Sequence, residues 1–289
     1  MYKLIKKLLY IFFSKEGRVI KVILIILWYF KRKRLNLLKN LFLKMHIILD
    51  FYNNRNAVGQ FLDKIKIIGS PYEIIRIGDN EDGGYLCPNI LNQIKFNFSP
   101  GVGYLTSFED HLLSYGIKSY LADGTVNYDG NHDFLKKNLN TFNDKKNITL
   151  DVWVNEKVKY ECDDLMLQMD IEGSEIEVLY HTNILDRFKI IIIEFHHFHD
   201  IVNKLGLKIY NDIFDKIFKT HQIFHIHPNN ASSILKINGI NIPDMIEITF
   251  INKKLPKVYK KIDYDLPHKL DKKNMKYLSD IKCPKDFYK

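Results

Sequence analysis

The sequence of 289 residues is poor in cysteine, with only Cys87, Cys162 and Cys283, and these three lie far apart. They form no C-x-x-C pair. This spacing argues against a structural zinc site and against a disulfide framework, and it is typical of proteins that work in a reducing compartment. We therefore expect a cytoplasmic protein.

Long hydrophobic runs are also missing. The longest uninterrupted apolar run, Val22 to Phe30, is far shorter than the roughly 20 residues that a membrane-spanning helix needs. No small-residue cleavage site follows it, so a secretory signal peptide is not expected. Residues 1–50 do place apolar residues at helical spacing around a basic run, Lys31 to Arg34. This pattern predicts a basic amphipathic helical segment at the inner, anionic face of a membrane. A helix packed on the rest of the chain or on another subunit is the alternative.

The charge balance narrows the classes of partner. A formal net charge of +9 favours acidic partners, but the basic runs lie near the two ends of the chain. Because these runs lack the interleaved aromatic residues of a single-strand groove, a nucleic-acid partner is not expected. The apolar fraction of 46% is sufficient for a sizeable core.

The chain divides into four parts. After residues 1–50, residues 51–94 predict a linker and a hairpin that turns at Asp82-Gly83. Residues 95–252 form the main α/β domain, and the lysine-rich residues 253–289 form a tail that we expect to wrap the surface.

Strand and helix patterns alternate through the main domain. The expected strands cover residues 95–98, 117–122, 148–154, 165–169, 189–195, 222–226 and 245–251. The expected helices cover residues 107–115, 133–139, 175–181 and 201–220. This alternation predicts a doubly wound, Rossmann-like, seven-stranded and mostly parallel sheet. The last two strands have no helix between them, which indicates an antiparallel pair at the end of the domain.

The chain is organised around residues 165–175, where an apolar strand is followed by two carboxylates and a helix start. Asp170 and Glu172 fall at the end of this strand, the edge at which open α/β sheets bind ligands. Gly173 permits a close turn and Ser174 is a candidate helix cap. The alternative is that both carboxylates only cap the helix.

A second signal follows the first strand of the domain. Gly101 and Gly103 leave the backbone open to a ligand, and Asp123 lies at the end of the next strand, where a carboxylate can accept from both hydroxyls of a ribose. We predict that Ser99 and Asp170 also contact this cofactor. The third glycine of the dinucleotide fingerprint is absent, which favours a smaller adenosine cofactor over NAD.

The later strands end in polar side chains as well. Parallel strands would bring these groups to one rim, and core packing explains so many of them poorly. We predict that Asp170 is the base, because a carboxylate or an imidazole can take a hydroxyl proton. The other predicted catalytic residues are Glu172, Glu194, His196 and His227, and the predicted acceptor contacts are Asp82, Tyr85, His197, Asn229 and Asn230.

Several motifs together resemble the FkbM-like methyltransferases. Residues 167–175 look like the "K-x-D-x-E-G-x-E" signature of this family, with Gln168 in place of the common lysine. The likeness extends to residues 78–85, 101–109, 193–196, 225–230 and 242–244. Ser99 and Leu105 replace an acid and a glycine that class I methyltransferases commonly have there, which affects contacts to the methionine end of the cofactor.

The resemblance implies the class I Rossmann-like fold and S-adenosylmethionine as the cofactor. It is compatible with an O-methyltransferase that acts on a sugar hydroxyl of a surface glycan or of a lipid-linked precursor. Three alternatives remain: a metal-assisted methyltransferase, a non-catalytic membrane-associated protein and a nucleic-acid-binding module. The first needs carboxylates and a histidine that hold a divalent cation.

Overall fold

The computed structural model describes residues 53, 55–67, 69–237, 239–255, 262 and 264–288, all of which fall in the unit formed by residues 53–289. The predicted amphipathic segment, residues 1–50, lies outside the described residues. None of the helices in the described ranges is both long enough and apolar enough to cross a bilayer.

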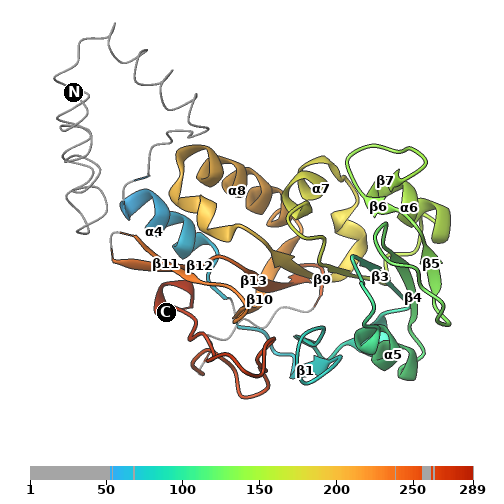
Figure 1. The fold of residues 1–289 in the computed structure, drawn as a ribbon, viewed down its shortest axis with the longest axis horizontal. Helices are drawn as coiled ribbons and strands as arrows, with labels where there is room; N and C mark the ends of the chain where they lie inside the picture. The colour runs from blue at the N-terminus through green and yellow to red at the C-terminus, as the bar shows by residue number, and fades with distance from the viewer. Residues whose placement is uncertain are drawn as a thin grey trace, which may run out of the picture. The chain divides into compact units, whose positions relative to one another are not determined.

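The centre of this unit is a seven-stranded sheet in the order β10-β13-β9-β8-β3-β4-β5 (Figure 1). Its strands are β3 (Phe96–Pro100), β4 (Lys118–Ala122), β5 (Asp133–Leu135), β8 (Leu165–Met169), β9 (Phe188–Phe195), β10 (His221–Pro228) and β13 (Ile246–Asn252). Strand β13 runs antiparallel to both of its neighbours, and the other pairs in the sheet are parallel. The expected mostly parallel sheet with a terminal antiparallel pair is thereby confirmed.

Helices and short pairs of strands surround the sheet. The helices are α4 (Arg55–Lys64), α5 (Ser107–Ser114), α6 (Leu150–Lys157), α7 (Glu175–His181) and α8 (Lys204–Ile217), with 3-10 turns at Leu91–Gln93, Leu185–Arg187, Phe198–Val202 and Lys285–Phe287. The additional strand pairs are β1 (Ile74–Ile77) with β2 (Tyr85–Pro88), β6 (Asn138–Leu139) with β7 (Asn147–Ile148), and β11 (Ile234–Ile237) with β12 (Ile240–Pro243).

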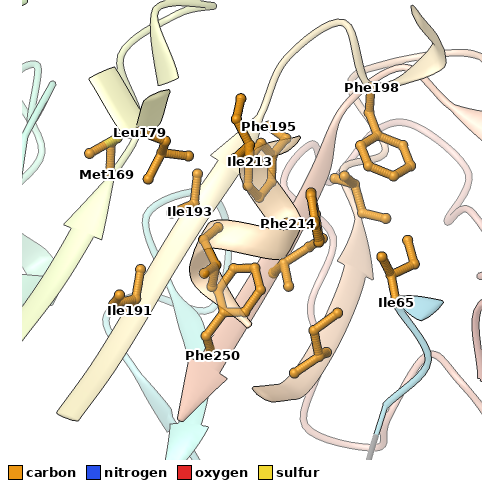
Figure 2. Packing of buried hydrophobic residues seen from close by; sticks show 14 of the residues in the cluster. Ile65, Met169, Leu179, Ile191, Ile193, Phe195, Phe198, Ile213, Phe214 and Phe250 are labelled. Carbon is orange, nitrogen blue, oxygen red and sulfur yellow. The ribbon is translucent and has the colours of Figure 1, made fainter. Parts of the chain in front are cut away.

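The two faces of the sheet bury two separate apolar clusters, because neighbouring residues of a strand point to opposite faces. On one face Ile191 and Ile193 of β9 pack in a cluster with Phe214 of α8 (Figure 2). On the other face Ile190 and Ile192 belong to a cluster that includes α5 and the β1–β2 hairpin. Helices therefore cover both faces, as a doubly wound sheet requires.

The face beneath the β1–β2 hairpin becomes polar towards β13. Strand β13 buries Ile248 on the first face, whereas Glu247 and Thr249 point to the second. Thr249 Oγ1 donates a hydrogen bond of 2.6 Å to the carbonyl oxygen of Leu86 in the hairpin. The hairpin thus closes over a buried polar layer at β13 as well as over the apolar cluster.

Two sequence-based assignments were wrong. The expected helix over residues 133–139 forms strands β5 and β6, and the expected strand over residues 148–154 contains helix α6. The side chain of Thr149 accepts from the backbone of Val152 and caps that helix, and Trp153 is fully buried against Phe98. Capping and tertiary packing thus outweigh the strand preference of the β-branched residues there. The sheet still has seven strands because β5 replaces the expected strand.

The C-terminal tail contributes to the core instead of only wrapping the surface. Phe287 is fully buried, and its ring centroid lies 6.0 Å from that of Phe198. Asp271 of the tail pairs with His225 of β10 at 2.8 Å. The tail therefore reaches the polar layer beneath the hairpin.

Candidate active site

The predicted site residues gather at the carboxyl edge of the parallel strands. The loop from Gly101 follows β3, Asp123 follows β4, Asp170 follows β8 and His196 follows β9. Because parallel strands end at the same edge, the topology places these residues on one rim.

The glycine loop touches the rim directly. Gly101 has a φ of +81°, and a Cβ atom on it would lie 1.6 Å from the carbonyl oxygen of Asp170. Only glycine at position 101 allows these two backbone segments to approach so closely. Gly103 also has a positive φ, +58°, but a Cβ atom there would meet nothing within 4 Å. The loop is therefore packed tightly against the backbone of Asp170 at Gly101, whereas Gly103 has open space beside it.

Asp123 holds this loop in place. Its Oδ2 accepts from the backbone N–H of Gly103 at 3.0 Å. Its Oδ1 accepts from the backbone and the hydroxyl of Thr125, both at 2.6 Å, and from the backbone of Val126 at 3.3 Å. Burial opposes ionisation, but these donors lower the pKa of Asp123. Oδ1 already accepts three hydrogen bonds and Oδ2 only one, so Oδ2 has the greater capacity left to accept from a ribose hydroxyl.

Ser99 does not reach the rim. Its side chain is fully buried, and its hydroxyl accepts from Asn97 Nδ2 at 3.0 Å. A side-chain contact between Ser99 and the cofactor is therefore excluded in this conformation.

Asp170, Glu172 and Glu175 surround His196. The imidazole Nε2 lies 4.0 Å from Asp170 Oδ1 and 3.4 Å from Glu172 Oε2. Its Nδ1 lies 3.2 Å from Oε1 of Glu175, which is fully buried. The same oxygen accepts from the backbone N–H groups of Ile171 and Gly173, each at 3.0 Å. Glu175 therefore fixes the ring so that Nε2 faces the other two carboxylates.

Burial and the neighbouring charges shift the pKa values in this group. Burial raises the pKa of Asp170 to about 7, with His196 opposing the shift and the nearby Glu172, Glu175 and Asp82 adding to it. Burial disfavours the imidazolium, but the hydrogen bond with Glu175 and the surrounding carboxylates raise the pKa of His196. A carboxyl group with a pKa near neutrality beside an imidazole is typical of acid–base sites.

The turn after Asp170 differs from the expected extended register. Glu172 adopts a left-handed conformation with a φ of +56°, which is uncommon for a residue other than glycine. Its side chain is 87% exposed. Ser174 makes no side-chain cap hydrogen bond, and the buried Glu175 binds the turn's backbone instead. Neither Asp170 nor Glu172 therefore acts as the helix cap that the alternative reading required.

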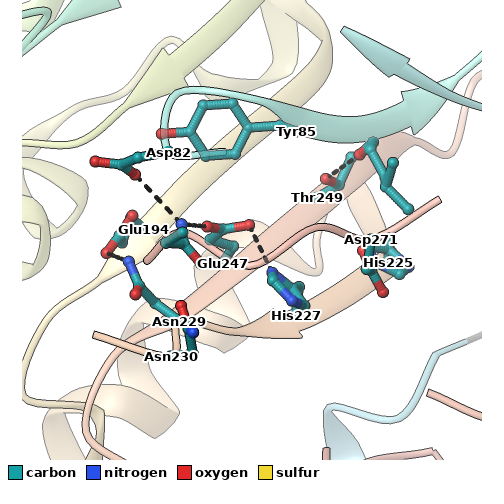
Figure 3. Close-up of polar contacts among 12 residues, drawn as sticks. Asp82, Tyr85, Glu194, His225, His227, Asn229, Asn230, Glu247, Thr249 and Asp271 are labelled. Atoms are coloured by element: carbon teal, nitrogen blue, oxygen red, sulfur yellow. Dashed lines mark hydrogen bonds and ion pairs between the residues drawn. The ribbon is translucent and has the colours of Figure 1, made fainter. Parts of the chain in front are cut away.

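A second polar group lies beneath the hairpin (Figure 3). Asn229 Nδ2 donates to Oε1 of Glu194 at 2.8 Å. Glu247 of β13 lies opposite Glu194 of β9 in the sheet. Its Oε2 lies 3.2 Å from Nδ1 of His227. Asn274 of the tail donates to Glu247 at 2.6 Å and to Asp82 at 3.3 Å. The predicted residues Asp82, Glu194, His227 and Asn229 are thus brought together.

Burial and neighbouring charges also shift the pKa values of this second group. Burial, together with the charges of Asp170 and Glu247, raises the pKa of Glu194 well above its ordinary value. Burial alone would lower the pKa of His227, but Glu247 raises it to about 9. Glu247 thus favours the imidazolium form of His227, while Glu194 retains its proton more readily than an exposed carboxyl.

Other predicted residues take different places. Tyr85 is buried and its hydroxyl accepts from Gln168 Nε2 at 3.3 Å, which links the hairpin to β8. His197 is left-handed and its side chain is 68% exposed beside Asp244. Asn230 is buried and bonds to the backbone of Met275, so the structure gives it a role in anchoring the tail.

Three residues were missed by the sequence reasoning. Glu175 stood in the central motif, where it was interpreted only as the start of a helix. Glu247 alternates with apolar residues in β13, which was a readable signal for a polar side chain on one face. Asn274 lies 192 residues from its partner Asp82, and no local pattern indicates that contact.

A family model described as the methyltransferase FkbM domain matches residues 70–226, just over half of the chain. The protein belongs to this family. The match covers the hairpin, the glycine loop, Asp170 and His196, and it ends before Glu247 and Asn274. The family and the mostly parallel sheet together agree with a methyltransferase.

The other comparisons add little. No curated protein sequence matches the chain significantly. A solved structure from Lactococcus lactis, provisionally described as a hemolysin, shares 11% sequence identity and covers 69% of this chain and 88% of its own. Its TM-score of 0.28 carries no argument about fold or function.

Proposed function

We propose that the protein is an S-adenosylmethionine-dependent O-methyltransferase. One observation carries the proposal: the glycine loop expected to bind the cofactor lies directly against the backbone of Asp170. A cofactor on Gly101 and Gly103 would therefore lie next to the carboxylate and imidazole rim. Family membership supports the same reaction class.

The residues of the loop fit such a cofactor. Open space beside Gly103 lets the backbone approach an adenosine. Oδ2 of Asp123 accepts one hydrogen bond from the protein, which leaves it able to accept one from a ribose hydroxyl. When bound, S-adenosylmethionine supplies an electrophilic methyl group on its sulfonium.

The rim supplies the proton acceptor. A hydroxyl that is to be methylated must give up its proton, and Asp170 has a buried oxygen without a hydrogen-bond partner among the described residues. His196, held by Glu175, lies beside it. Positioning of the acceptor does most of the work in such a displacement, and the base contributes further.

A polyhydroxylated acceptor suits the second polar group. Glu194 and Asn229 can bind hydroxyls, with Asp82 and His227 nearby. We propose a sugar hydroxyl of a surface glycan or of a lipid-linked precursor as the acceptor, by analogy with the family. The basic, apolar residues 1–50 support a place at the inner face of a membrane.

Two titrations test the class of function. Calorimetry with S-adenosylmethionine and, in parallel, with NAD should show binding of the first only. Binding of neither would favour a non-catalytic membrane-associated protein. Salt-dependent binding of single-stranded nucleic acid without cofactor binding would favour the nucleic-acid module instead.

A further inference from the structure

Within the described part of the chain, Asp170, Glu172 and His196 form a group in which one ligand atom from each lies within 4.8 Å of the other two. We propose that these three residues bind a divalent cation of the Mg²⁺ or Mn²⁺ class, and that this cation binds a pair of hydroxyls on the acceptor. The binding of acceptor hydroxyls to the cation rests on the proposed function, whereas the binding of the cation to the protein does not.

The orientation of His196 is the first argument. A metal-binding histidine commonly gives its other ring nitrogen to a carboxylate, which fixes the tautomer and the ring. Here Nδ1 of His196 lies 3.2 Å from the buried Glu175, and Nε2 is directed at Glu172 and Asp170. Glu175 is itself held by two backbone N–H groups. The ring is therefore preorganised before any ligand arrives.

Unpartnered oxygens are the second argument. Oδ1 of Asp170 is buried and has no hydrogen-bond partner among the described residues. Glu194 follows the last register pair of β8 and β9 beside Asp170, is only 2% exposed, and has an unpartnered Oε2. Buried oxygens left without partners are costly. A cation would satisfy Asp170, and a water molecule bound to that cation could donate to Glu194.

The backbone at Glu172 is the third argument. Its φ of +56° is a conformation that a glutamate rarely adopts. This turn, which the adjacent Gly173 with a φ of +101° continues, brings Oε2 of Glu172 within 3.4 Å of His196. Strained backbone of this kind is often found at binding sites. The exposed Glu172 side chain would leave the cation accessible from solvent.

The ligand set indicates the kind of cation. Two carboxylates and one imidazole offer mainly hard oxygen ligands, which suit Mg²⁺ or Mn²⁺ better than a thiolate-seeking ion. These cations take about six ligands, so three protein ligands leave positions for water or for two neighbouring hydroxyls. A sugar diol fits those positions, and coordination would lower the pKa of a bound hydroxyl. With Oδ1 of Asp170 on the cation, the other oxygen of the same carboxylate would accept the hydroxyl proton.

Binding of Mn²⁺ to the full chain, after removal of metals with EDTA, tests the site without any methyl transfer. The paramagnetic resonance signal of free Mn²⁺ reports the bound fraction. We expect one tight Mn²⁺ per chain that Mg²⁺ displaces. Glu172→Gln should weaken binding at least about tenfold, and Glu175→Gln should weaken it by a similar factor by freeing His196.

Glu177→Gln is the matched control, because Glu177 is an exposed glutamate of the adjacent helix α7 that does not belong to the group. It should leave the affinity for Mn²⁺ unchanged, and circular dichroism should show all variants folded. No binding at millimolar Mn²⁺, or equal affinity of Glu172→Gln and Glu177→Gln, would overturn the site.

A parallel titration with S-adenosylmethionine separates the two proposals. Cofactor binding without Mn²⁺ binding rejects the cation site and leaves the proposed function intact. Mn²⁺ binding without cofactor binding supports the site and rejects the proposed function.

Discussion

The two halves of the rim differ in how well their polar groups are satisfied. On the β3–β4 side, the two oxygens of Asp123 accept four hydrogen bonds from the protein. On the β8–β9 side, Asp170 and Glu194 each keep a buried oxygen without a partner among the described residues. Hydrogen bonds stabilise the charged form of Asp123, whereas burial raises the pKa of Asp170 and Glu194.

The difference shows which half of the rim has its polar groups satisfied by the protein before a ligand binds. A carboxylate held by several donors fixes a loop and presents a preformed surface, and Oδ2 of Asp123 keeps the capacity to accept one more hydrogen bond. Unpartnered buried carboxylates cost stability and gain partners only when a substrate, a water molecule or a cation arrives. This difference supports the proposed roles, in which the first half holds a cofactor and the second acts on the acceptor.

The largest expected effect comes from removing the proton acceptor. Asp170→Asn keeps the shape of the side chain but cannot take a proton, so transfer should fall by roughly 100-fold or more. Cofactor affinity should stay within a few-fold, because Asp123 and the glycine loop are intact. His196→Ala should behave in the same way. Methyl transfer assays with purified variants measure this, and retained turnover in both would show the rim to be scaffolding.

The same Asp170→Asn variant should be more stable than the wild type at high pH. The folded pKa of about 7 lies above the ordinary value of 3.8, so ionisation destabilises the fold progressively from about pH 4 to pH 7. Above pH 7 the gain should be on the order of 1–4 kcal/mol, and near pH 4 it should vanish. Unfolding in urea with EDTA present measures it, and a gain independent of pH would contradict the assignment.

A side chain inserted at the contact between Gly101 and Asp170, where the two halves of the rim meet, should have the next largest effect. Gly101→Ala places a Cβ atom against the carbonyl oxygen of Asp170 at a positive φ, which should cost more than about 2 kcal/mol and disturb both halves. Gly103→Ala is the matched control. It has open space and should cost only about 1 kcal/mol. Equal melting temperatures for the two variants would mean that the contact is not tight.

Loosening the cofactor half should weaken binding moderately. Asp123→Ala removes the expected ribose contact and the support of Gly103, which should cost on the order of 1–3 kcal/mol of cofactor affinity. Calorimetry with S-adenosylmethionine measures the change. An unchanged affinity would remove Asp123 from the cofactor site.

The smallest effect concerns the ion pair beneath the hairpin. The folded pKa of His227, about 9, lies above its ordinary value of 6.5. Its contribution, on the order of 1–3 kcal/mol, is complete below pH 6.5 and is lost as the pH rises through 9. Glu247→Gln should flatten this part of the stability profile. A profile with the same slope in that variant would show that another group titrates.

The sequence allowed the fold to be predicted where the local signal and the packing agree. The isoleucine run of β9 is buried on both faces, and its apolar character indicated a central strand directly. Residues 148–154 misled because Val152, Trp153 and Val154 favour a strand, whereas the cap at Thr149 and the burial of Trp153 decide for a helix. Whether such a segment forms a helix or a strand depends on packing partners that are distant in the sequence.

The candidate site shows the same division. The positions of Asp170 and His196 followed from the ends of parallel strands, which topology alone brings together. The left-handed turn at Glu172 and the support from Glu175 depend on the exact backbone path. Asn274 reaches Glu247 only because the tail folds back over the sheet, so no spacing in the sequence indicates it.

Calorimetric titration of the full chain and of its Asp123→Ala and Asp170→Asn variants with S-adenosylmethionine tests whether the two halves of the rim have separate roles. We expect the wild type to bind one cofactor per chain, Asp123→Ala to bind it more weakly, and Asp170→Asn to bind it almost as well as the wild type. The absence of binding to the wild type, or a loss of affinity confined to Asp170→Asn, would contradict the division of the rim into a cofactor half and a chemical half.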